Sequence, residues 1–183
     1  MGARETYKVN LAGLDRELPL FEVKPGLKIA VLNILGDTPL VQACAKELAK
    51  LTSGYSFDVI VTAESKSIPL AYAMSLALGK PYIVLRKSYK FYMGESLKAQ
   101  TISITTGAPQ TLILDEKDHD LIRNKKVMIL DDVISTGSTL EGMRDLMHQA
   151  GAEIAVEAAI CTEGDDDSWK GIVSLAHLPL FSE

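Results

Sequence analysis

Short apolar segments alternate with helix-length segments along most of the chain, and this alternation restricts the possible folds more than any other feature. The segments predicted as strands are Asp58–Thr62, Tyr82–Leu85, Lys126–Leu130 and Glu153–Cys161, with Lys28–Leu35 as an earlier strand or extended segment. The predicted helices begin after an N-cap at Asp37 and run to about Leu51, over Ile68–Leu78, and over Ser138–Ala150. Strands that alternate with helices pair in parallel, so the sequence predicts an α/β fold with a doubly wound, mainly parallel sheet.

The region between about residues 86 and 114 breaks this alternation. It carries basic and aromatic residues, then two Thr-rich stretches, Thr101–Thr105 and Thr111–Leu114, around Gly107. We predict a flexible loop that runs into a hairpin, with Tyr89–Ala99 as a lid. The chain of 183 residues contains no linker, and 47% of its residues are hydrophobic, which is enough for the core of one domain.

Length, charge and the ends of the chain exclude several classes of protein. Met1–Asn10 lacks the apolar segment of a signal peptide, and Ile68–Leu78 is shorter than a membrane span, so we expect a cytoplasmic protein with no membrane partner. Cys44 and Cys161 are predicted as buried thiols in a reducing compartment. Nineteen basic and 24 acidic residues give a net charge of −5, so we expect no nucleic-acid partner and predict that any phosphate is held locally.

The most informative segment follows the predicted strand Lys126–Leu130. Two carboxylates, Asp131 and Asp132, stand where the strand ends. A run of small residues then leads into a helix N-terminus: Ser135, Thr136, Gly137, Ser138 and Thr139. Free backbone N–H groups, hydroxyls and the positive end of the helix dipole make such a loop suited to a phosphate. The two carboxylates would accept hydrogen bonds from hydroxyls of the same ligand, so the pattern favours a sugar phosphate.

This segment resembles the phosphoribosyl-diphosphate signature of type I phosphoribosyltransferases, in which four apolar and two acidic residues precede a Thr-Gly-(Gly/Ser)-Thr loop. The resemblance covers about residues 20–163 and is closest to the adenine phosphoribosyltransferase-like branch. It implies that Asp131 and Asp132 hold the ribose hydroxyls and that residues 135–139 hold the 5′-phosphate. It also implies one phosphoribosyltransferase domain over residues 1–183, with a small hood from about 1–35 and 161–183.

Two further segments fit the same resemblance. The loop Glu64, Ser65, Lys66 and Ser67 resembles a diphosphate loop, with Lys66 where Arg is usual and Ser67 where Gly is common. Arg86 and Lys87 resemble the basic pair of purine-specific members, and Lys90 is a further candidate in the lid. The resemblance assigns catalytic roles to Asp131, Asp132, Lys66 and Arg86, and implies a Mg²⁺ cofactor held by Asp131 and Asp132, directly or through water.

The implied activity is a pentosyltransferase of purine salvage that joins phosphoribosyl diphosphate to a purine base, adenine before the others. The candidate base-binding residues are Leu32, Asn33, Ile34, Val133 and Glu163. The sequence departs from adenine enzymes at Lys28-Ile29-Ala30 and at Ile104–Gly107, so xanthine, hypoxanthine or guanine stays possible. The resemblance also implies a homodimer whose diphosphate site is completed across the subunit boundary.

One alternative comes from a different class of protein. Purine-repressor relatives use this fold as a non-catalytic sensor of phosphoribosyl diphosphate and carry an added DNA-binding domain. About 25 residues precede the expected core here, which we interpret as too few for such a domain. A receiver-like signalling domain fits less well, because it has its paired aspartates near the start of the chain.

Overall fold

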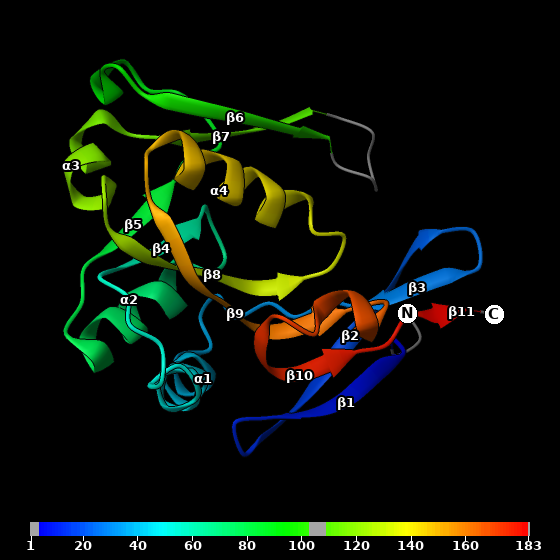
Figure 1. Ribbon diagram of the computed structural model, residues 1–183. Helices are drawn as coiled ribbons and strands as arrows, with labels where there is room; N and C mark the ends of the chain where they lie inside the picture. Colours follow the sequence, from blue (N-terminus) through cyan, green and yellow to red (C-terminus); the bar gives the residue numbers. More distant parts are fainter. Residues whose placement is uncertain (1–3, 103–108, 183) are drawn as a thin grey trace.

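A five-stranded parallel sheet forms the centre of the computed structural model, which describes residues 4–102 and 109–182 (Figure 1). The strand order is β10-β9-β8-β4-β5, and every neighbouring pair is parallel. Its strands are β4 (Val59–Ala63), β5 (Tyr82–Leu85), β8 (Lys126–Ile134), β9 (Glu153–Glu163) and β10 (Val173–Leu178). The predicted α/β class and parallel sheet are confirmed, and β10 is an additional edge strand.

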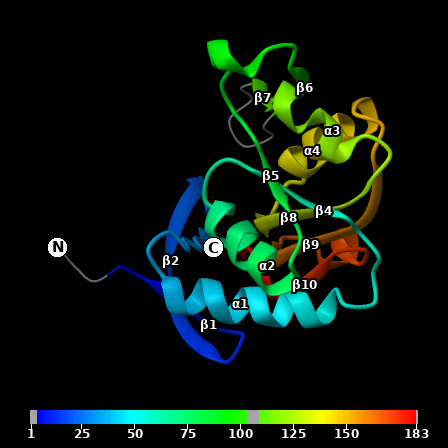
Figure 2. The same cartoon turned by 90° about the vertical axis from the view of Figure 1, so that its left-hand side faces the viewer.

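Helices cover both faces of this sheet. On one face lie α1 (Thr38–Leu51) and α2 (Ile68–Leu78), and on the other lies α4 (Ser138–Gln149) (Figures 1 and 2). Two clusters of buried residues correspond to the two faces: one contains Leu40, Leu48 and Met74, and the other contains Met143 and Leu146. Each face therefore has its own apolar core, as a doubly wound sheet requires.

The helix boundaries follow the predicted signals. The Asp37 side chain caps α1 by accepting a hydrogen bond from Leu40 N, with Pro39 in the first turn. Arg16 donates to both carboxylate oxygens of Asp37, at 2.7 and 2.9 Å. Gly79 ends α2 in the left-handed conformation, with φ +63°. The predicted helices are thus confirmed to within one residue at each end.

The N-terminal residues form a second sheet that the sequence analysis did not predict. Strands β1 (Thr6–Leu11), β2 (Leu14–Lys24), β3 (Leu27–Ala30) and β11 (Phe181–Ser182) pair in an antiparallel sheet. The predicted strand Lys28–Leu35 is corrected: only its first part is a strand, and it belongs to this small sheet rather than to the central one. The four strands join the two ends of the chain at one side of the central sheet (Figure 1). Of the residues assigned to the hood, those in β10 belong to the central sheet instead.

The segment after β5 forms a hairpin packed on α4, built from β6 (Leu97–Ile102) and β7 (Pro109–Leu114). Gln149 Nε2 donates to Lys98 O at 3.3 Å, and a Cβ on Gly142 would lie 2.8 Å from Thr101 Cγ2. Strand β6 therefore runs toward the N-terminal end of α4. Residues 103–105 of the predicted Thr-rich stretch, and Gly107, lie outside the described residues.

The predicted lid, Tyr89–Ala99, is partly built into the fold. It contains the short 3₁₀ helix η1 (Phe91–Met93), and the side chains of Met93 and Ala99 are buried. Glu95 N donates to Glu116 Oε2 at 2.8 Å, where Glu116 begins the 3₁₀ helix η2 (Glu116–Asp118) that leads into α3 (His119–Ile122). These contacts attach the segment to the hairpin side of the molecule.

Two other features bear on the earlier predictions. Cys44 and Cys161 are buried free thiols, as predicted. None of the helices in the described ranges has both the length and the apolar character needed to cross a membrane.

Candidate functional site

Two adjoining depressions lie at the carboxyl end of β8, where the chain passes toward α4. The larger has a volume of about 260 Å³, and the smaller about 90 Å³. Both are lined by Asp131, Val133 and Thr139, so they lie side by side and are together called the hollow. The larger depression is also lined by residues 63–67, Lys87 and Asp132. The smaller is also lined by residues 134–138 and Leu140. The structure thus brings the two predicted anion-binding loops together around the paired aspartates.

The loop Ser135–Thr139, hereafter the phosphate loop, surrounds the smaller depression. Gly137 is the N-cap of α4 and has φ +79°, a conformation that favours glycine. Its missing side chain also leaves space for Trp169, because a Cβ there would lie 2.9 Å from Trp169 Cη2. The helix begins without a side-chain cap, so its first N–H groups and its dipole are available to an anion in this depression.

The paired aspartates lie within β8 and are nearly covered. The strand continues to Ile134, beyond the predicted end at Leu130. Asp131 is 8% exposed and Asp132 is 6% exposed. Asp131 Oδ1 accepts a hydrogen bond from Asp132 N at 2.8 Å. Burial, followed by the charge of Asp132, raises the pKa of Asp131. Both carboxylates line the larger depression. Because they are otherwise buried, the protein interior disfavours a full negative charge on each of them.

The loop Glu64–Ser67, hereafter the diphosphate loop, lies across the larger depression and contains a cis peptide bond between Glu64 and Ser65. Glu64 Oε2 accepts hydrogen bonds from Arg86 Nε at 3.0 Å and from Lys87 N at 2.7 Å. Burial opposes ionisation of Glu64, yet these donors hold the pKa of its carboxyl below its usual value. Arg86 exchanges backbone hydrogen bonds with Ile113 of β7, so Glu64 joins this loop to the start of the hairpin segment.

Ser67 has a structural position within the diphosphate loop. Its hydroxyl donates to Ala63 O at 3.0 Å and lies 2.8 Å from Thr62 Oγ1, and the residue is 1% exposed. Its φ of −81° and ψ of −6° are ordinary helical angles. A serine therefore fits where glycine is common in the family, because this backbone conformation does not require glycine.

Lys66 crosses from the diphosphate loop to the end of β8. Its Nζ forms an ion pair with Asp132 Oδ2 at 2.9 Å and donates to Leu32 O at 3.2 Å. The Lys66 side chain is 44% exposed, whereas that of Asp132 is 8% exposed. The ammonium group thus lies over the carboxylate that the sequence analysis assigned to a sugar hydroxyl.

The candidate base-binding residues have different surroundings. Val133 is half-buried and lines both depressions. Leu32 and Ile34 are 2% and 0% exposed and pack in the apolar core, which leaves their main-chain atoms as the groups that a base could reach. Asn33 is exposed, and its Oδ1 accepts from Leu35 N at 3.2 Å.

Glu163 ends β9, beside the phosphate loop. It is 3% exposed, and burial raises the pKa of its carboxyl, although a hydrogen bond from Ser135 opposes part of this effect. Its main-chain oxygen accepts a hydrogen bond from Trp169 Nε1 at 2.9 Å. Glu163 therefore supports the loop from behind and does not line either depression.

Most of the predicted site residues line this hollow. Six line neither depression: Leu32, Asn33, Ile34, Arg86, Lys90 and Glu163. Arg86 contacts the diphosphate loop through Glu64, and Ser67 lines the larger depression but uses its hydroxyl internally. Trp169, from the 3₁₀ helix η3 (Asp166–Trp169), was missed. Its signal was a lone aromatic residue in an otherwise acidic turn, which the sequence alone does not connect to residue 137.

The carboxylate oxygens of the aspartate pair are of the kind that magnesium binds together with a phosphate-bearing substrate. Within residues 4–102 and 109–182, no group of three or more His, Cys, Asp or Glu side chains converges on a point. Magnesium in proteins is commonly held by one or two carboxylates together with phosphate oxygens of the substrate. Asp131 and Asp132 fit that pattern, because they face the hollow between the two anion-binding loops.

Comparison with known proteins agrees with this geometry. A family model described as a phosphoribosyl transferase domain matches residues 31–170. The chain is 32% identical over 142 residues to the adenine phosphoribosyltransferase of Butyrivibrio fibrisolvens, with 76% of this chain and 75% of that protein covered. It is 29% identical over 164 residues to the purine biosynthesis transcriptional repressor PurR of Bacillus subtilis. This match covers 89% of this chain but only 55% of PurR.

Solved structures share the fold. The adenine phosphoribosyltransferase of Thermoanaerobacter pseudethanolicus superposes with a TM-score of 0.72 at 21% identity, covering 87% of this chain and 95% of the other. The enzyme from Giardia lamblia, solved with 9-deazaadenine, gives a TM-score of 0.71 at 20% identity, covering 87% and 93%. With a family match over more than half of its length and a hollow built from that family's signature loop, this chain belongs to the phosphoribosyltransferase family.

Proposed function

We propose that the protein transfers the 5-phosphoribosyl group from phosphoribosyl diphosphate to a purine base, with adenine as the favoured base, and releases diphosphate. One observation carries this proposal: the phosphate loop, the aspartate pair and the cationic diphosphate loop line two adjoining depressions at the carboxyl end of β8. A ligand with a phosphate, a diol and a diphosphate matches these three parts in order. The similarity to several proteins named adenine phosphoribosyltransferase supports the choice of base.

In the proposed reaction, the bond from C1 of the ribose to diphosphate breaks and a bond from C1 to a ring nitrogen of the base forms, while the proton on that nitrogen passes to solvent or to the released diphosphate. Positive charge develops on the sugar ring while negative charge grows on the leaving diphosphate. Lys66 and Lys87 would stabilise the diphosphate, with Arg86 positioning the loop through Glu64. The phosphate loop would fix the other end of the substrate, so catalysis rests on positioning and charge stabilisation.

We further propose that Asp131 and Asp132 would hold Mg²⁺, directly or through water, when the substrate is bound. The ion would supply positive charge to the leaving group. The position of both carboxylates in the larger depression, beside the diphosphate loop, supports this arrangement.

The direct test is incubation of the purified protein with phosphoribosyl diphosphate, Mg²⁺ and adenine, guanine, hypoxanthine or xanthine in separate reactions, scored by diphosphate release. Adenine should give the fastest release, and a reaction without base gives the background. If another base is faster, the assignment of adenine is wrong. If no base supports release, the proposal of catalysis is wrong.

A second candidate function is supported by the similarity to PurR, which spans nearly all of this chain but about half of that protein. In this alternative the same hollow binds phosphoribosyl diphosphate without catalysis. Saturable binding of phosphoribosyl diphosphate together with no diphosphate release from any of the four bases would favour the sensor over the enzyme.

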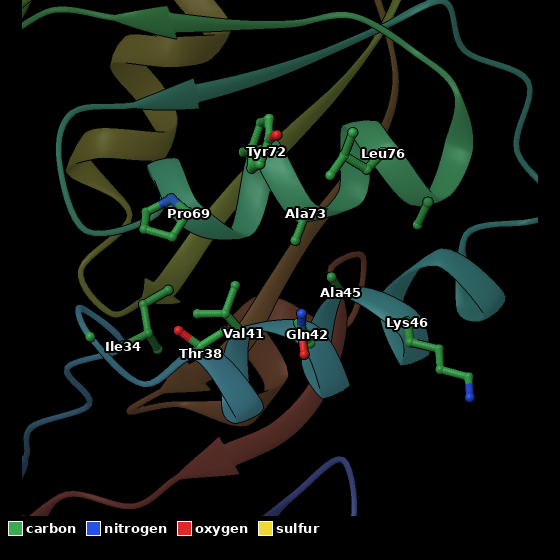
Figure 3. A pocket seen from close by; sticks show the side chains of 12 residues that line it. Ile34, Thr38, Val41, Gln42, Ala45, Lys46, Pro69, Tyr72, Ala73 and Leu76 are labelled. Atoms are coloured by element: carbon green, nitrogen blue, oxygen red, sulfur yellow. The ribbon is translucent and has the colours of Figure 1, made fainter.

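We also propose that the protein is a homodimer that associates through α2. This helix carries no charged residue, and only Leu70, Ala71 and Met74 are buried, while Tyr72 and Leu76 are 53% and 67% exposed. Between α1 and α2 lies an apolar cavity of about 540 Å³, to which Pro69, Tyr72, Ala73 and Leu76 contribute from α2 (Figure 3). A helix that is apolar on all sides is normally buried all round. A second copy of α2 offers the matching apolar surface that an isologous dimer needs.

The position of α2 connects this surface to the site, because the helix begins directly after the diphosphate loop. Leu76→Lys should convert a dimer to a monomer, as measured by light scattering. Leu121→Lys, which changes an exposed leucine on α3, is the matched control and should leave the dimer intact. A wild-type monomer would refute the proposed dimer, and a dimeric Leu76→Lys variant would refute the α2 interface.

The two buried free thiols support a reducing, cytoplasmic setting for the protein.

A further inference from the structure

Lys66 and Asp132 neutralise each other across the mouth of the larger depression. Their charged atoms, Lys66 Nζ and Asp132 Oδ2, are 2.9 Å apart, and the ammonium also donates to Leu32 O at 3.2 Å. The Asp132 side chain is buried, whereas Lys66 reaches it from the solvent side. The ammonium group therefore covers the carboxylate oxygen.

This contact competes with the proposed sugar contact. A ribose hydroxyl that donates to Asp132 Oδ2 must first displace the ammonium group. A neutral hydroxyl is a weaker partner for a carboxylate than an ammonium group, since charge-assisted hydrogen bonds are the stronger ones. Ribose 5-phosphate offers Lys66 no new anion in the larger depression, because its phosphate belongs in the phosphate loop.

Diphosphate changes this balance. Lys66 lines the depression in which the diphosphate would lie, so its ammonium group could exchange Asp132 for phosphate oxygens without losing an anionic partner. We propose that Lys66 is a specificity-determining residue that keeps Asp132 occupied until a diphosphate draws it away. The site would thereby favour a ligand that carries the diphosphate and the sugar together over the sugar phosphate alone. This inference rests on the proposed function.

Lys87 provides the comparison that isolates this effect. It lines the same depression and carries the same charge, but its side chain is exposed, and its backbone N–H is bonded to Glu64. Among the ion pairs found within residues 4–102 and 109–182, the partner of Asp132 is Lys66. Lys87 should therefore attract anions without blocking the aspartate.

The experiment measures the affinity of phosphoribosyl diphosphate and of ribose 5-phosphate by calorimetry, at one fixed Mg²⁺ concentration, for the wild type, Lys66→Met and Lys87→Met. Both variants should bind phosphoribosyl diphosphate about tenfold more weakly, because each loses one cation from the diphosphate site. Ribose 5-phosphate should separate them. Lys66→Met should bind it about fivefold more tightly than the wild type, since the aspartate is released, whereas Lys87→Met should bind it no more tightly.

The possible outcomes separate the role of Lys66 from the proposed function of the protein. A wild type that binds neither ligand would refute the proposed function itself. Binding of phosphoribosyl diphosphate by the wild type, with ribose 5-phosphate weakened or unchanged in Lys66→Met, would refute the role of Lys66 alone. Thermal unfolding of each variant checks that it is folded, and Lys66→Gln, which also removes the charge, serves as the second variant if Lys66→Met unfolds.

Discussion

The two loops that meet at the site follow strands of one sheet but are prepared in different ways. In the phosphate loop, Gly137 opens the N-terminus of α4 without a side-chain cap, so backbone donors face a small open depression. In the diphosphate loop, the charged side chains already have partners within the protein: Glu64 binds Arg86 and Lys66 binds Asp132. One loop is ready to accept an anion, whereas the other must exchange internal partners for a ligand. This difference indicates that the phosphate loop contributes affinity, whereas the diphosphate loop discriminates ligands that carry a diphosphate from those that do not.

The most severe way to break this arrangement is Asp132→Asn, which removes the charge that pairs with Lys66 in the larger depression. We expect diphosphate release to fall at least about a hundredfold, because the amide is a weaker acceptor for the sugar hydroxyl and a weaker ligand for Mg²⁺. Steady-state kinetics with adenine measures the effect, and circular dichroism checks the fold. Near-normal turnover in the folded variant would contradict the role of Asp132 at the sugar.

Gly137→Ala tests whether the phosphate loop is ready before the ligand arrives. The new Cβ would meet Trp169 at 2.9 Å and would also sit at a φ of +79°. We expect the affinity for ribose 5-phosphate to fall about tenfold, because the loop must shift away from its binding conformation.

Gly151→Ala is the control for Gly137→Ala. Its φ of +72° imposes a comparable backbone strain, but nothing lies within 4 Å of the new Cβ. This variant should lose about 1 kcal/mol of stability and keep its affinity for ribose 5-phosphate. Equal losses of affinity in the two variants would show that the loop is not specifically shaped for the phosphate.

Ser67→Ala sharpens the description of the diphosphate loop. The Ser67 hydroxyl is buried and bonded to Ala63 O, so its removal should lower the free energy of unfolding by about 1 kcal/mol. Chemical denaturation measures this loss. Ser53→Ala, which removes another hydroxyl from an exposed turn, should change stability by much less. If the two variants are equally stable, Ser67 does not support the loop from within.

The smallest expected effect concerns pH and the support behind the phosphate loop. Burial raises the pKa of Glu163 in the folded protein above its unfolded value, so the folded state retains a proton that the unfolded state has lost. The contribution of Glu163 to stability is therefore full below the unfolded pKa and declines as pH rises through the folded pKa. Glu163→Gln should remove this decline. Denaturation of both proteins between about pH 4 and pH 8 tests the prediction, which fails if the two pH profiles are parallel.

Sequence reasoning succeeded where local patterns determine local structure. The apolar runs predicted four of the five strands of the central sheet, all but β10, and Asp37 with Pro39 predicted the start of α1. The pattern of residues 131–139 predicted which loop would surround the smaller depression. These features depend on residues close together in the chain, so a single sequence can reveal them.

The missed features depend on distant contacts or on weak local signals. Strands β1 and β2 carry many polar residues, and only the turn at Ala12-Gly13, where both residues have positive φ, marks their hairpin. The ion pair of Lys66 with Asp132 joins segments 66 positions apart, and the contact of Trp169 with Gly137 depends on how β9 places the turn after it. The burial of Met93 and Ala99 in the predicted lid depends on packing that the sequence does not show.

The contact between Trp169 and Gly137 has a practical consequence. Trp169 is the only tryptophan of the chain, and its ring lies against the loop that would receive the 5′-phosphate. Excitation of indole in the unlabelled wild-type protein therefore reports on one location, next to the proposed ligand. A ligand that reorders this loop would change the emission spectrum, and stopped-flow recording of that signal would time the arrival of the substrate before any bond is broken.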